Sequence, residues 1–467
     1  MENASASSRR QFLKLSGLAG AASILPGCTN LATTKVKPAG QAKNVIYLMV
    51  DGLCNGTVGL AHHWHLRHKA TPLNWMQLFE REGLHRAYQD TASANSPVTD
   101  SAAAASAWGS GQRVNNGSIN IDPSGKSLKP ILSYAKEAGK ATGLVTSCRI
   151  THATPAGFST NVPKRGMEDA IAQQYLEREI DVLLGGGARH FRQTQEDSRV
   201  IDYIPQFEAK GYQIVKTASE LSAIRGGGPL LGLFSQSHIP YAIDRQNDRK
   251  YKDVPSLVDM FSAALTQLDG AKDGFVLQVE GGRVDHAGHG NDPGGILHEF
   301  LEFDACIPIA LEFIESHPDT MLVVTTDHGT GGCQLDGAGS AYLDSGPALD
   351  RINQLRHSFE WLQQGFEAKG KFDPVLLKTA LGIEPTDAQA AIVQAALDSE
   401  AQYLSGALNQ AFGKQLNKLT AVGWTSDKHT SECVELFAFG PGSEAIPAMI
   451  KNYEIFAILT NALGIEV

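Results

Sequence analysis

The sequence has few cysteines, few charged residues and no excess of basic ones. Six of its 467 residues are cysteine, and no two of them form a C-x-x-C pair, so a zinc site made of cysteines is not expected. Charged residues make up 19% of the chain and the formal net charge is -10, which argues against a nucleic-acid partner. A phosphate compound remains compatible with this acidity, because bound cations can reverse the local field.

A long apolar run is also missing. The run from Leu15 to Leu25 is too short to span a bilayer, but it follows Arg9-Arg10 and so resembles a twin-arginine export signal. Leu25-Pro26-Gly27-Cys28 resembles a lipobox, in which Cys28 would be lipidated and become the new N-terminus. We therefore expect residues 1–28 to be a signal, residues 29–42 a linker, and the product to be exported to the periplasm or cell envelope with a lipid on Cys28. The alternative is a basic tail.

The rest of the chain, residues 43–467, alternates apolar runs with helical patterns. This alternation predicts an α/β fold with a doubly wound, mostly parallel sheet flanked by helices. Residues 335–420 are rich in Gln and Ala and predict a helical insertion. The expected strands are 44–50, 143–148, 180–184, 212–215, 230–234, 275–277, 321–326 and 434–439. The expected helices are 128–139, 254–268, 294–316 with a kink near Pro308, and 446–463.

Acidic residues lie at or just after the ends of three predicted strands: Asp51, Glu280 and Asp327. The carboxyl ends of strands are where open α/β sheets bind ligands. One helical turn would put Asp285 and His289 on the same face, where a carboxylate and an imidazole can bind a divalent metal. Each piece alone is also compatible with an ordinary turn or solvated loop. Together, acids that would otherwise repel one another predict a site for cations.

Ser101 stands at the start of a helical run, Ser101-Ala-Ala-Ala-Ala-Ser-Ala-Trp108. A helix N-terminus stabilises anions such as phosphate or an alkoxide, so Ser101 is a candidate nucleophile. The alternative is that Asp100 or Ser101 only caps the helix.

Another polar cluster follows the predicted strand 143–148. His152 and Thr154 come first, and Arg165 lies further along the chain. The guanidinium of arginine matches the geometry of phosphate oxygens, although a solvent-facing arginine is the simpler reading of Arg165 by itself.

Taken in order, these residues resemble the motifs of alkaline phosphatases. The matching pieces are Asp51, Asp100-Ser101-Ala102, Ala153-Thr154-Pro155, Glu280-Gly281 with Asp285 and His289, Asp327-His328, and His429-Thr430. The resemblance covers residues 44–442 and is weakest across the helical insertion. It implies a metal-dependent phosphomonoesterase with an alkaline pH optimum and a homodimeric assembly.

The resemblance also implies two Zn²⁺ ions and one Mg²⁺ ion. One zinc ion would be held by Asp285, His289 and His429, and the other by Asp51, Asp327 and His328. The magnesium ion would be held by Asp51, Thr154 and Glu280, since oxygen ligands suit it.

The same resemblance assigns the chemistry. Ser101 would attack the phosphate monoester and form a phosphoserine, Arg165 would grip the phosphoryl oxygens, and Asp100 would orient Arg165. His152 and His286 stand where some family members have an aspartate and a lysine. Both are expected beside the third metal, either as ligands or as neighbours of ligands, and His152 could shift that site from magnesium towards zinc.

Two other activities share parts of this pattern. A sulfatase modifies a Cys or Ser in a C/S-x-P-x-R context, which the alanines after Ser101 contradict. A phosphodiesterase needs room for a second ester group, and the sequence does not give the shape of a pocket. A lipoprotein that binds metal or phosphate without catalysis is a further alternative, but it would not need a nucleophile at Ser101.

Overall fold

The computed structural model describes residues 41–194, 200–399 and 401–467. The predicted signal, Cys28 and most of the predicted linker lie outside these residues. Within them, no helix combines the length and the apolar character needed to cross a membrane.

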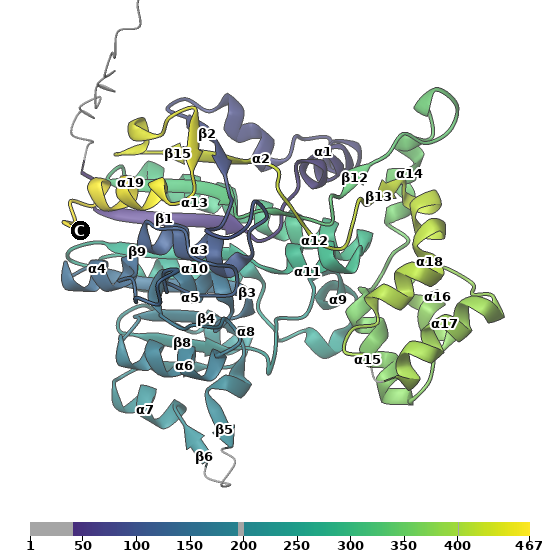
Figure 1. Ribbon diagram of the computed structural model, residues 1–467, viewed down its shortest axis with the longest axis horizontal. Helices are drawn as coiled ribbons and strands as arrows, with labels where there is room; N and C mark the ends of the chain where they lie inside the picture. Colours follow the sequence, from purple (N-terminus) through teal and green to yellow (C-terminus); the bar gives the residue numbers. More distant parts are fainter. Residues whose placement is uncertain (1–40, 195–199, 400) are drawn as a thin grey trace, which may run out of the picture. The chain divides into compact units, whose positions relative to one another are not determined.

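A ten-stranded sheet forms the centre of the described fold (Figure 1). Its strand order is β16-β2-β15-β10-β1-β9-β3-β4-β8-β7. All neighbours pair in parallel except β10 with β15 and β15 with β2, so the predicted mostly parallel sheet is confirmed. The strands are β1 (Asn44–Val50), β2 (His85–Asp90), β3 (Ala141–Arg149), β4 (Val182–Gly186), β7 (Gln213–Val215), β8 (Leu230–Leu233), β9 (Phe275–Gly281), β10 (Thr320–Thr326), β15 (Val434–Phe439) and β16 (Met449–Lys451).

Helices cover both faces of this sheet because its central strands are apolar on both sides (Figure 1). In β1, Ile46, Leu48 and Val50 belong to one buried core, and Val45, Tyr47 and Met49 to the other. The first core includes residues of α1 (Asn55–Lys69), α2 (Asn74–Gln77), α8 (Ala218–Ser222), α9 (Ala242–Asn247), α10 (Leu257–Leu268), α11 (Arg283–Gly290), α12 (Pro293–Asp304) and α13 (Cys306–Ser316). The second includes residues of α3 (Ser101–Ser110), α4 (Ile131–Glu137), α5 (Ala153–Ser159), α6 (Glu168–Glu177), α7 (Ile204–Ala209) and α19 (Glu454–Ala462).

A set of helices separates two short paired strands, β12 (Gln334–Leu335) and β13 (Val422–Gly423). Leu335 pairs with Val422, so the chain leaves and re-enters the main fold at one point. The helices are α14 (Ser345–Ile352), α15 (Phe359–Lys369), α16 (Pro374–Leu381), α17 (Asp387–Asp398) and α18 (Ser405–Thr420). The short remaining strands are β5 (Arg192–Thr194), which pairs with β6 (Val200–Asp202), and β11 (Gly329–Thr330), which pairs with β14 (His429–Thr430).

Some predicted helices are wrong in their limits. The predicted helix 294–316 is divided at Ala305 rather than kinked near Pro308. Pro308 lies in the first turn of α13, where a missing N–H costs no intrahelical hydrogen bond. The predicted helix 446–463 begins only at Glu454, because residues 449–451 pair with β2 as strand β16.

Two further helices start later than predicted. The helix predicted from residue 128 starts at Ile131, after Pro130. The helix predicted from residue 254 starts at Leu257, after a capping box formed by Ser256 and Asp259.

The cysteines of the described residues form no disulfide: Cys54, Cys148, Cys306, Cys333 and Cys433 are all free. Only Cys433 is exposed, and the other four are buried.

Candidate active site

The pairing of β1, β9 and β10 brings the predicted acids together. Val50 pairs with Thr326, so Asp51 and Asp327 follow at the same level of two adjacent parallel strands. Met49 pairs with Glu280 on the other side of β1. All three carboxylates are fully buried. Three buried acids at one edge of a sheet repel one another unless cations or protons offset their charge.

Asp51 and Asp327 enclose the imidazole of His328. The Nε2 atom of His328 lies 3.2 Å from Asp327 Oδ2 and 3.6 Å from Asp51 Oδ1. The ligand atoms of these three residues all lie within 4.8 Å of one another. Two carboxylates and one imidazole at this spacing are suitable ligands for Zn²⁺.

Asp285, His289 and His429 form a second group. The predicted turn of helix exists as α11, and it presents Asp285 and His289 on one face. The Nε2 atoms of His289 and His429 are 3.0 Å apart, and each is 3.5 Å from Asp285 Oδ1.

The second nitrogen of each imidazole fixes its tautomer. His289 Nδ1 lies 2.7 Å from the carbonyl oxygen of Asp427, and His429 Nδ1 lies 2.8 Å from that of Thr99. Because a carbonyl oxygen only accepts, both Nδ1 atoms carry the proton. In the neutral rings, the two Nε2 atoms therefore direct lone pairs at each other and at a carboxylate oxygen. A cation between them satisfies all three atoms.

A third group contains Asp51, His152 and Glu280, whose ligand atoms also lie within 4.8 Å of one another. Thr154 follows His152 at the start of α5. Several polar atoms of these residues are buried without a hydrogen-bond partner: Asp51 Oδ2, His152 Nδ1, Thr154 Oγ1 and Glu280 Oε1. Unpartnered buried polar atoms are rare and costly, so they fit a position that a cation fills.

Burial and mutual repulsion shift the titration of these acids. Burial and the nearby Asp327 raise the pKa of Asp51, and burial also raises the pKa of Asp327. Burial raises the pKa of Glu280 to about 7. The pKa of Asp285 is instead lowered: burial acts to raise it, but the positive charge that His289 and His429 carry when protonated outweighs that effect. Without cations, the first three carboxyls therefore hold protons more tightly than exposed ones do.

Ser101 lies at the N-terminal end of α3, against Asp51 and His328. Its Oγ atom is 3.5 Å from Asp51 Oδ1 and 3.4 Å from His328 Nε2, and the residue is buried. Asp100 is the N-cap, since its Oδ1 accepts a hydrogen bond from the backbone N–H of Ala103. Ser101 is thus the first residue of the helix, where unpaired N–H groups favour an anion.

Arg165 is held beside Ser101 by two neighbours. Its Nη1 donates to Asp100 Oδ2 at 3.1 Å, and its Nη2 lies 3.2 Å from His152 Nε2. Asp100 Oδ2 also accepts from the backbone N–H of Gly117. These contacts fix the guanidinium next to the start of α3.

Thr330 and Thr146 also hold site carboxylates, although neither was predicted from the sequence. Thr330 Oγ1 donates to Asp285 Oδ1 at 2.6 Å and lies 3.3 Å from His328 Nδ1. Thr146 Oγ1 donates to Glu280 Oε2. Thr330 follows Asp327-His328-Gly329 directly, so its closeness to that motif was the available signal. His286, predicted beside the third metal, lies in a different group, with Cys148 and His238.

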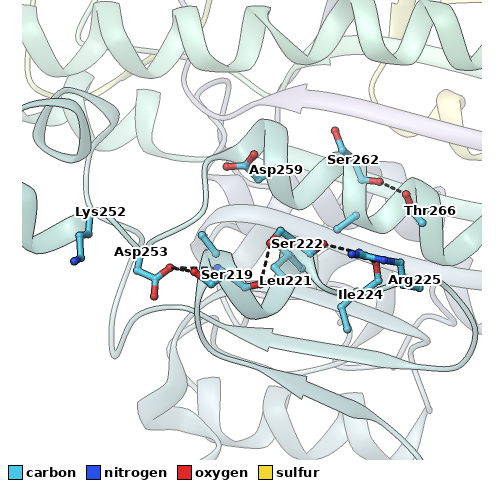
Figure 2. A pocket seen from close by; sticks show the side chains of 12 residues that line it. Ser219, Leu221, Ser222, Ile224, Arg225, Lys252, Asp253, Asp259, Ser262 and Thr266 are labelled. Carbon is cyan, nitrogen blue, oxygen red and sulfur yellow. Dashed lines mark hydrogen bonds between the residues drawn. The ribbon is translucent and has the colours of Figure 1, made fainter.

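A cavity of about 890 Å³ adjoins the second group. His289 lines it together with His238, Arg283 and parts of α15. Another cavity, of about 740 Å³, lies between α8 and α10 and is lined by Ser219, Asp253 and their neighbours (Figure 2). None of the predicted site residues lines that second cavity.

Comparison with known proteins agrees with this geometry. The alkaline phosphatase family model matches residues 42–465. Alkaline phosphatase 3 of Bacillus subtilis (strain 168) is 33% identical over 452 residues, which is 94% of each chain. Streptomycin-6-phosphate phosphatase of Streptomyces griseus is 30% identical over 479 residues, 93% of each chain. The crystal structure of Thermus thermophilus alkaline phosphatase superposes with a TM-score of 0.83 at 33% identity, covering 95% of this chain and 96% of that one.

The chain belongs to the alkaline phosphatase family, and it is an alkaline phosphatase enzyme. Its fold is that of the family, including the large, mostly parallel sheet flanked by helices.

Proposed function

We propose that the protein hydrolyses phosphate monoesters through a phosphoserine on Ser101, and that it depends on two Zn²⁺ ions and one Mg²⁺ ion. Membership of the family supports monoester hydrolysis. The position of Ser101 Oγ, within 3.5 Å of both Asp51 and His328, is the observation that carries the covalent step. A serine nucleophile must be activated, and a hydroxyl beside the proposed metal ligands is close enough for a bound cation to lower its pKa.

Three sets of ligands are proposed for the metals. Asp285, His289 and His429 would hold one zinc ion. Asp51, Asp327 and His328 would hold the other. The magnesium ion would lie among Asp51, Glu280 and Thr154, and His152 would either join its ligands, favouring zinc, or remain a neighbour. When bound, these cations would lower the pKa of the Ser101 hydroxyl and offset the charge of the phosphoryl group and the leaving oxygen.

The proposed reaction consists of two successive displacements at phosphorus. Ser101 Oγ forms a bond to phosphorus as the bond to the ester oxygen breaks. The hydroxyl proton passes to solvent, and the leaving oxygen takes up a proton from solvent to become the alcohol. Arg165, fixed by Asp100, donates its N–H groups to the phosphoryl oxygens. Water next loses a proton and attacks the phosphoserine, the bond to Oγ breaks, Oγ regains a proton, and inorganic phosphate leaves. Two successive displacements predict retention of configuration at phosphorus.

Replacement of Ser101 tests this role. Ser101→Ala should lose nearly all turnover of a nitrophenyl phosphate monoester while it keeps its full metal content by elemental analysis. Ser110→Ala is the matched control, because Ser110 stands at the other end of α3 and donates only to the carbonyl of Ser106. Unchanged turnover in Ser101→Ala would refute the assignment.

The class of ester needs a separate test. We expect the protein to hydrolyse a nitrophenyl monoester much faster than the corresponding diester. A strong preference for the diester would instead make the protein a phosphodiesterase on the same fold.

We also propose export, lipidation of Cys28 and a homodimer, with residues 43–467 as the catalytic domain and 335–420 as its helical insertion. The arginine pair and lipobox pattern support the first two, and the family resemblance supports the dimer. Mass spectrometry of the exported protein should find diacylglycerol on Cys28, and an intact, lipid-free leader would contradict this. Light scattering of the purified protein tests the dimer.

A further inference from the structure

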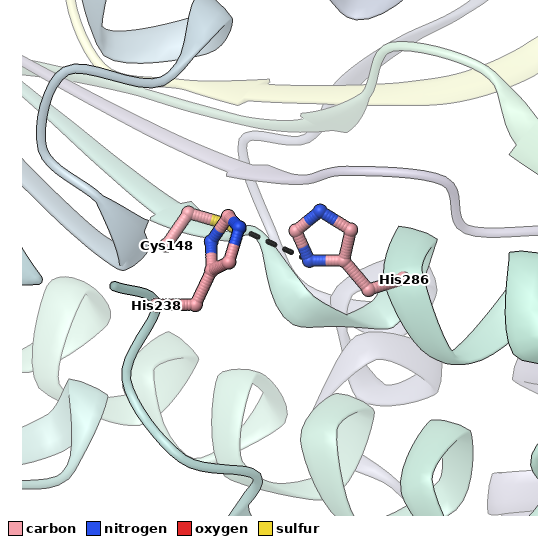
Figure 3. Close-up of side chains that lie close together, drawn as sticks. All are labelled: Cys148, His238 and His286. Carbon is pink, nitrogen blue, oxygen red and sulfur yellow. Dashed lines mark hydrogen bonds between the residues drawn. The ribbon is translucent and has the colours of Figure 1, made fainter. Parts of the chain in front are cut away.

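Cys148, His238 and His286 form a fourth group, outside the three proposed metal sites (Figure 3). Cys148 lies near the end of β3, His238 follows β8, and His286 is on α11. The ligand atoms of the three residues lie within 4.8 Å of one another. Cys148 Sγ is 3.7 Å from His286 Nδ1, and the two imidazole rings are 4.4 Å apart between centroids.

We propose that this group binds a fourth metal cation, of the thiophilic class represented by Zn²⁺. One thiolate and two imidazoles are ligands that Zn²⁺ prefers over the oxygen-seeking Mg²⁺. The thiol of Cys148 would pass its proton to solvent as the sulfur–metal bond forms. Three protein ligands leave a fourth position for water.

The surroundings of the group give a cation a way in from the cavity. They also provide space for the sulfur of Cys148. His238 and His286 line the cavity of about 890 Å³, whereas Cys148 is fully buried behind them. Gly282 provides the space for the thiol: a Cβ atom at this position would lie 2.7 Å from Cys148 Sγ. The glycine pair before α11 therefore lets the sulfur face the two imidazoles.

Two arginines lie beside the imidazoles, but each is paired with an acid. Arg283 Nη1 lies 3.2 Å from His286 Nδ1, and its Nη2 contacts Glu360 at 2.5 Å. Arg149 pairs with Glu168 at 2.7 Å. Since a guanidinium only donates, its contact with His286 Nδ1 places a lone pair on that nitrogen. The cation would take the place of this donor, and Arg283 would keep its carboxylate.

His238 also loses little when it binds a cation. Its Nδ1 lies 3.3 Å from the backbone N–H of Arg149, and its Nε2 contacts the guanidinium of the same residue. A neutral imidazole accepts at one nitrogen only, so these two donors compete. A cation at Nε2 would displace the guanidinium of Arg149, which keeps Glu168 as its partner.

A cation bound at this site would link α11, through His286, to β3, through Cys148. His286 is the residue next to Asp285 and three before His289, both proposed zinc ligands. Its ring also lies 5.5 Å from the ring of His152. The fourth cation would thus hold in place the helix that supplies two ligands of the neighbouring site.

Sulfur makes the site distinguishable from the other three. Only this group among the described metal-binding groups contains a cysteine. The metal-free protein titrated with Co²⁺ should develop a near-ultraviolet thiolate-to-cobalt charge-transfer band, and the protein saturated with Zn²⁺ and Mg²⁺ should contain about three Zn²⁺ and one Mg²⁺ per chain.

Cys148→Ser and His238→Ala should each lose the charge-transfer band and one equivalent of Zn²⁺. Cys433→Ser, which removes the exposed cysteine, should keep both. Because the variant His238→Ala leaves the buried thiol in place, it keeps the test open if Cys148→Ser fails to fold. Absence of the band in the wild-type protein at saturating Co²⁺, or the same Zn²⁺ content in wild type and both variants, would overturn the proposal.

Discussion

Thr154 shows how a single buried atom points to a ligand. Its hydroxyl is fully buried beside Glu280 and has no hydrogen-bond partner. A hydroxyl in that position is costly unless a cation uses its lone pair. The hydroxyl of Thr154 is therefore the atom of the third group whose removal tests metal binding.

Thr154→Val should remove one metal ion per chain with little loss of volume, and Thr154→Ser should retain it. Metal content after dialysis, measured by elemental analysis, checks this. If Thr154→Val keeps the same content as Thr154→Ser, the hydroxyl is not a ligand.

Arg165 is expected to act through its two directed N–H groups. Arg165→Lys keeps the charge but loses the planar fork, so kcat/KM for a phosphate monoester should fall about tenfold to hundredfold, as expected for a hydrogen bond to a charged group worth roughly 1.5–3 kcal/mol. Arg113→Lys is the control, because Arg113 pairs with Asp90. An equal loss in both variants would indicate a structural effect rather than contact with substrate.

Site residues that stand in recognisable motifs could be predicted from the sequence. Residues that come together only through the fold could not. Asp51, Asp327-His328 and Asp285 with His289 each adjoin an apolar run or lie one helical turn apart, so their placement could be predicted. His238 joins Cys148 and His286 only because β8 and β3 are both bound to β4. Such closeness depends on strand order, which a single sequence does not give.

Among the elements, the turn after β1 packs closely against α11. Gly52 has φ +78°, and a Cβ atom there would lie 2.6 Å from Asp285 Cα. The turn that carries Asp51 and the helix that carries Asp285 therefore touch through a residue without a side chain. This contact sets the spacing between the two proposed zinc sites.

Gly52→Ala should destabilise the fold and weaken metal binding, because it adds a clash to the strain of a positive φ. We expect a loss of about 2–5 kcal/mol in the free energy of unfolding, the sum of left-handed strain and overpacking. Gly83→Ala is the matched control: its φ is +77°, but nothing lies within 4 Å of the added Cβ. Denaturant unfolding should show a loss of only about 1–2 kcal/mol for Gly83→Ala. Equal losses would mean that the contact with Asp285 is unimportant.

The elements were predictable where the apolar pattern is continuous. The strand predicted at 44–50 is β1 with the same limits, and that predicted at 434–439 is β15. Strand β2, with the polar sequence His-Arg-Ala-Tyr-Gln-Asp, was not predicted. It becomes a strand by pairing with β15 and β16, so tertiary pairing decides its structure rather than its composition.

For the whole molecule, the buried acids couple metal binding to stability and pH. In the metal-free protein, the folded-state pKa of Glu280 is raised from 4.5 to about 7. The folded state then binds a proton more tightly than the unfolded state, so this contribution to stability is present below pH 4.5 and is lost as pH rises through about 7. The raised pKa values of Asp51 and Asp327 act in the same direction.

Buried histidines act in the opposite direction: the lowered pKa values of His152, His286 and His328 give a contribution to stability that grows as pH rises to about 6.5. The contribution of Glu280 is therefore isolated by comparing wild type with Glu280→Gln in urea unfolding. In the metal-free state, the stability of wild type relative to this variant should fall between about pH 4.5 and 7. A difference between the two metal-free proteins that does not change with pH across this range would contradict the raised pKa of Glu280.

The most direct measurement of the central claim is the identification of the covalent intermediate. The metal-loaded protein would be mixed with excess phosphate monoester, quenched in acid during turnover, digested and examined by mass spectrometry. The account predicts one phosphoryl group, carried by Ser101. Continued turnover with no phosphorylated peptide, or with the phosphoryl group on another residue, would contradict it.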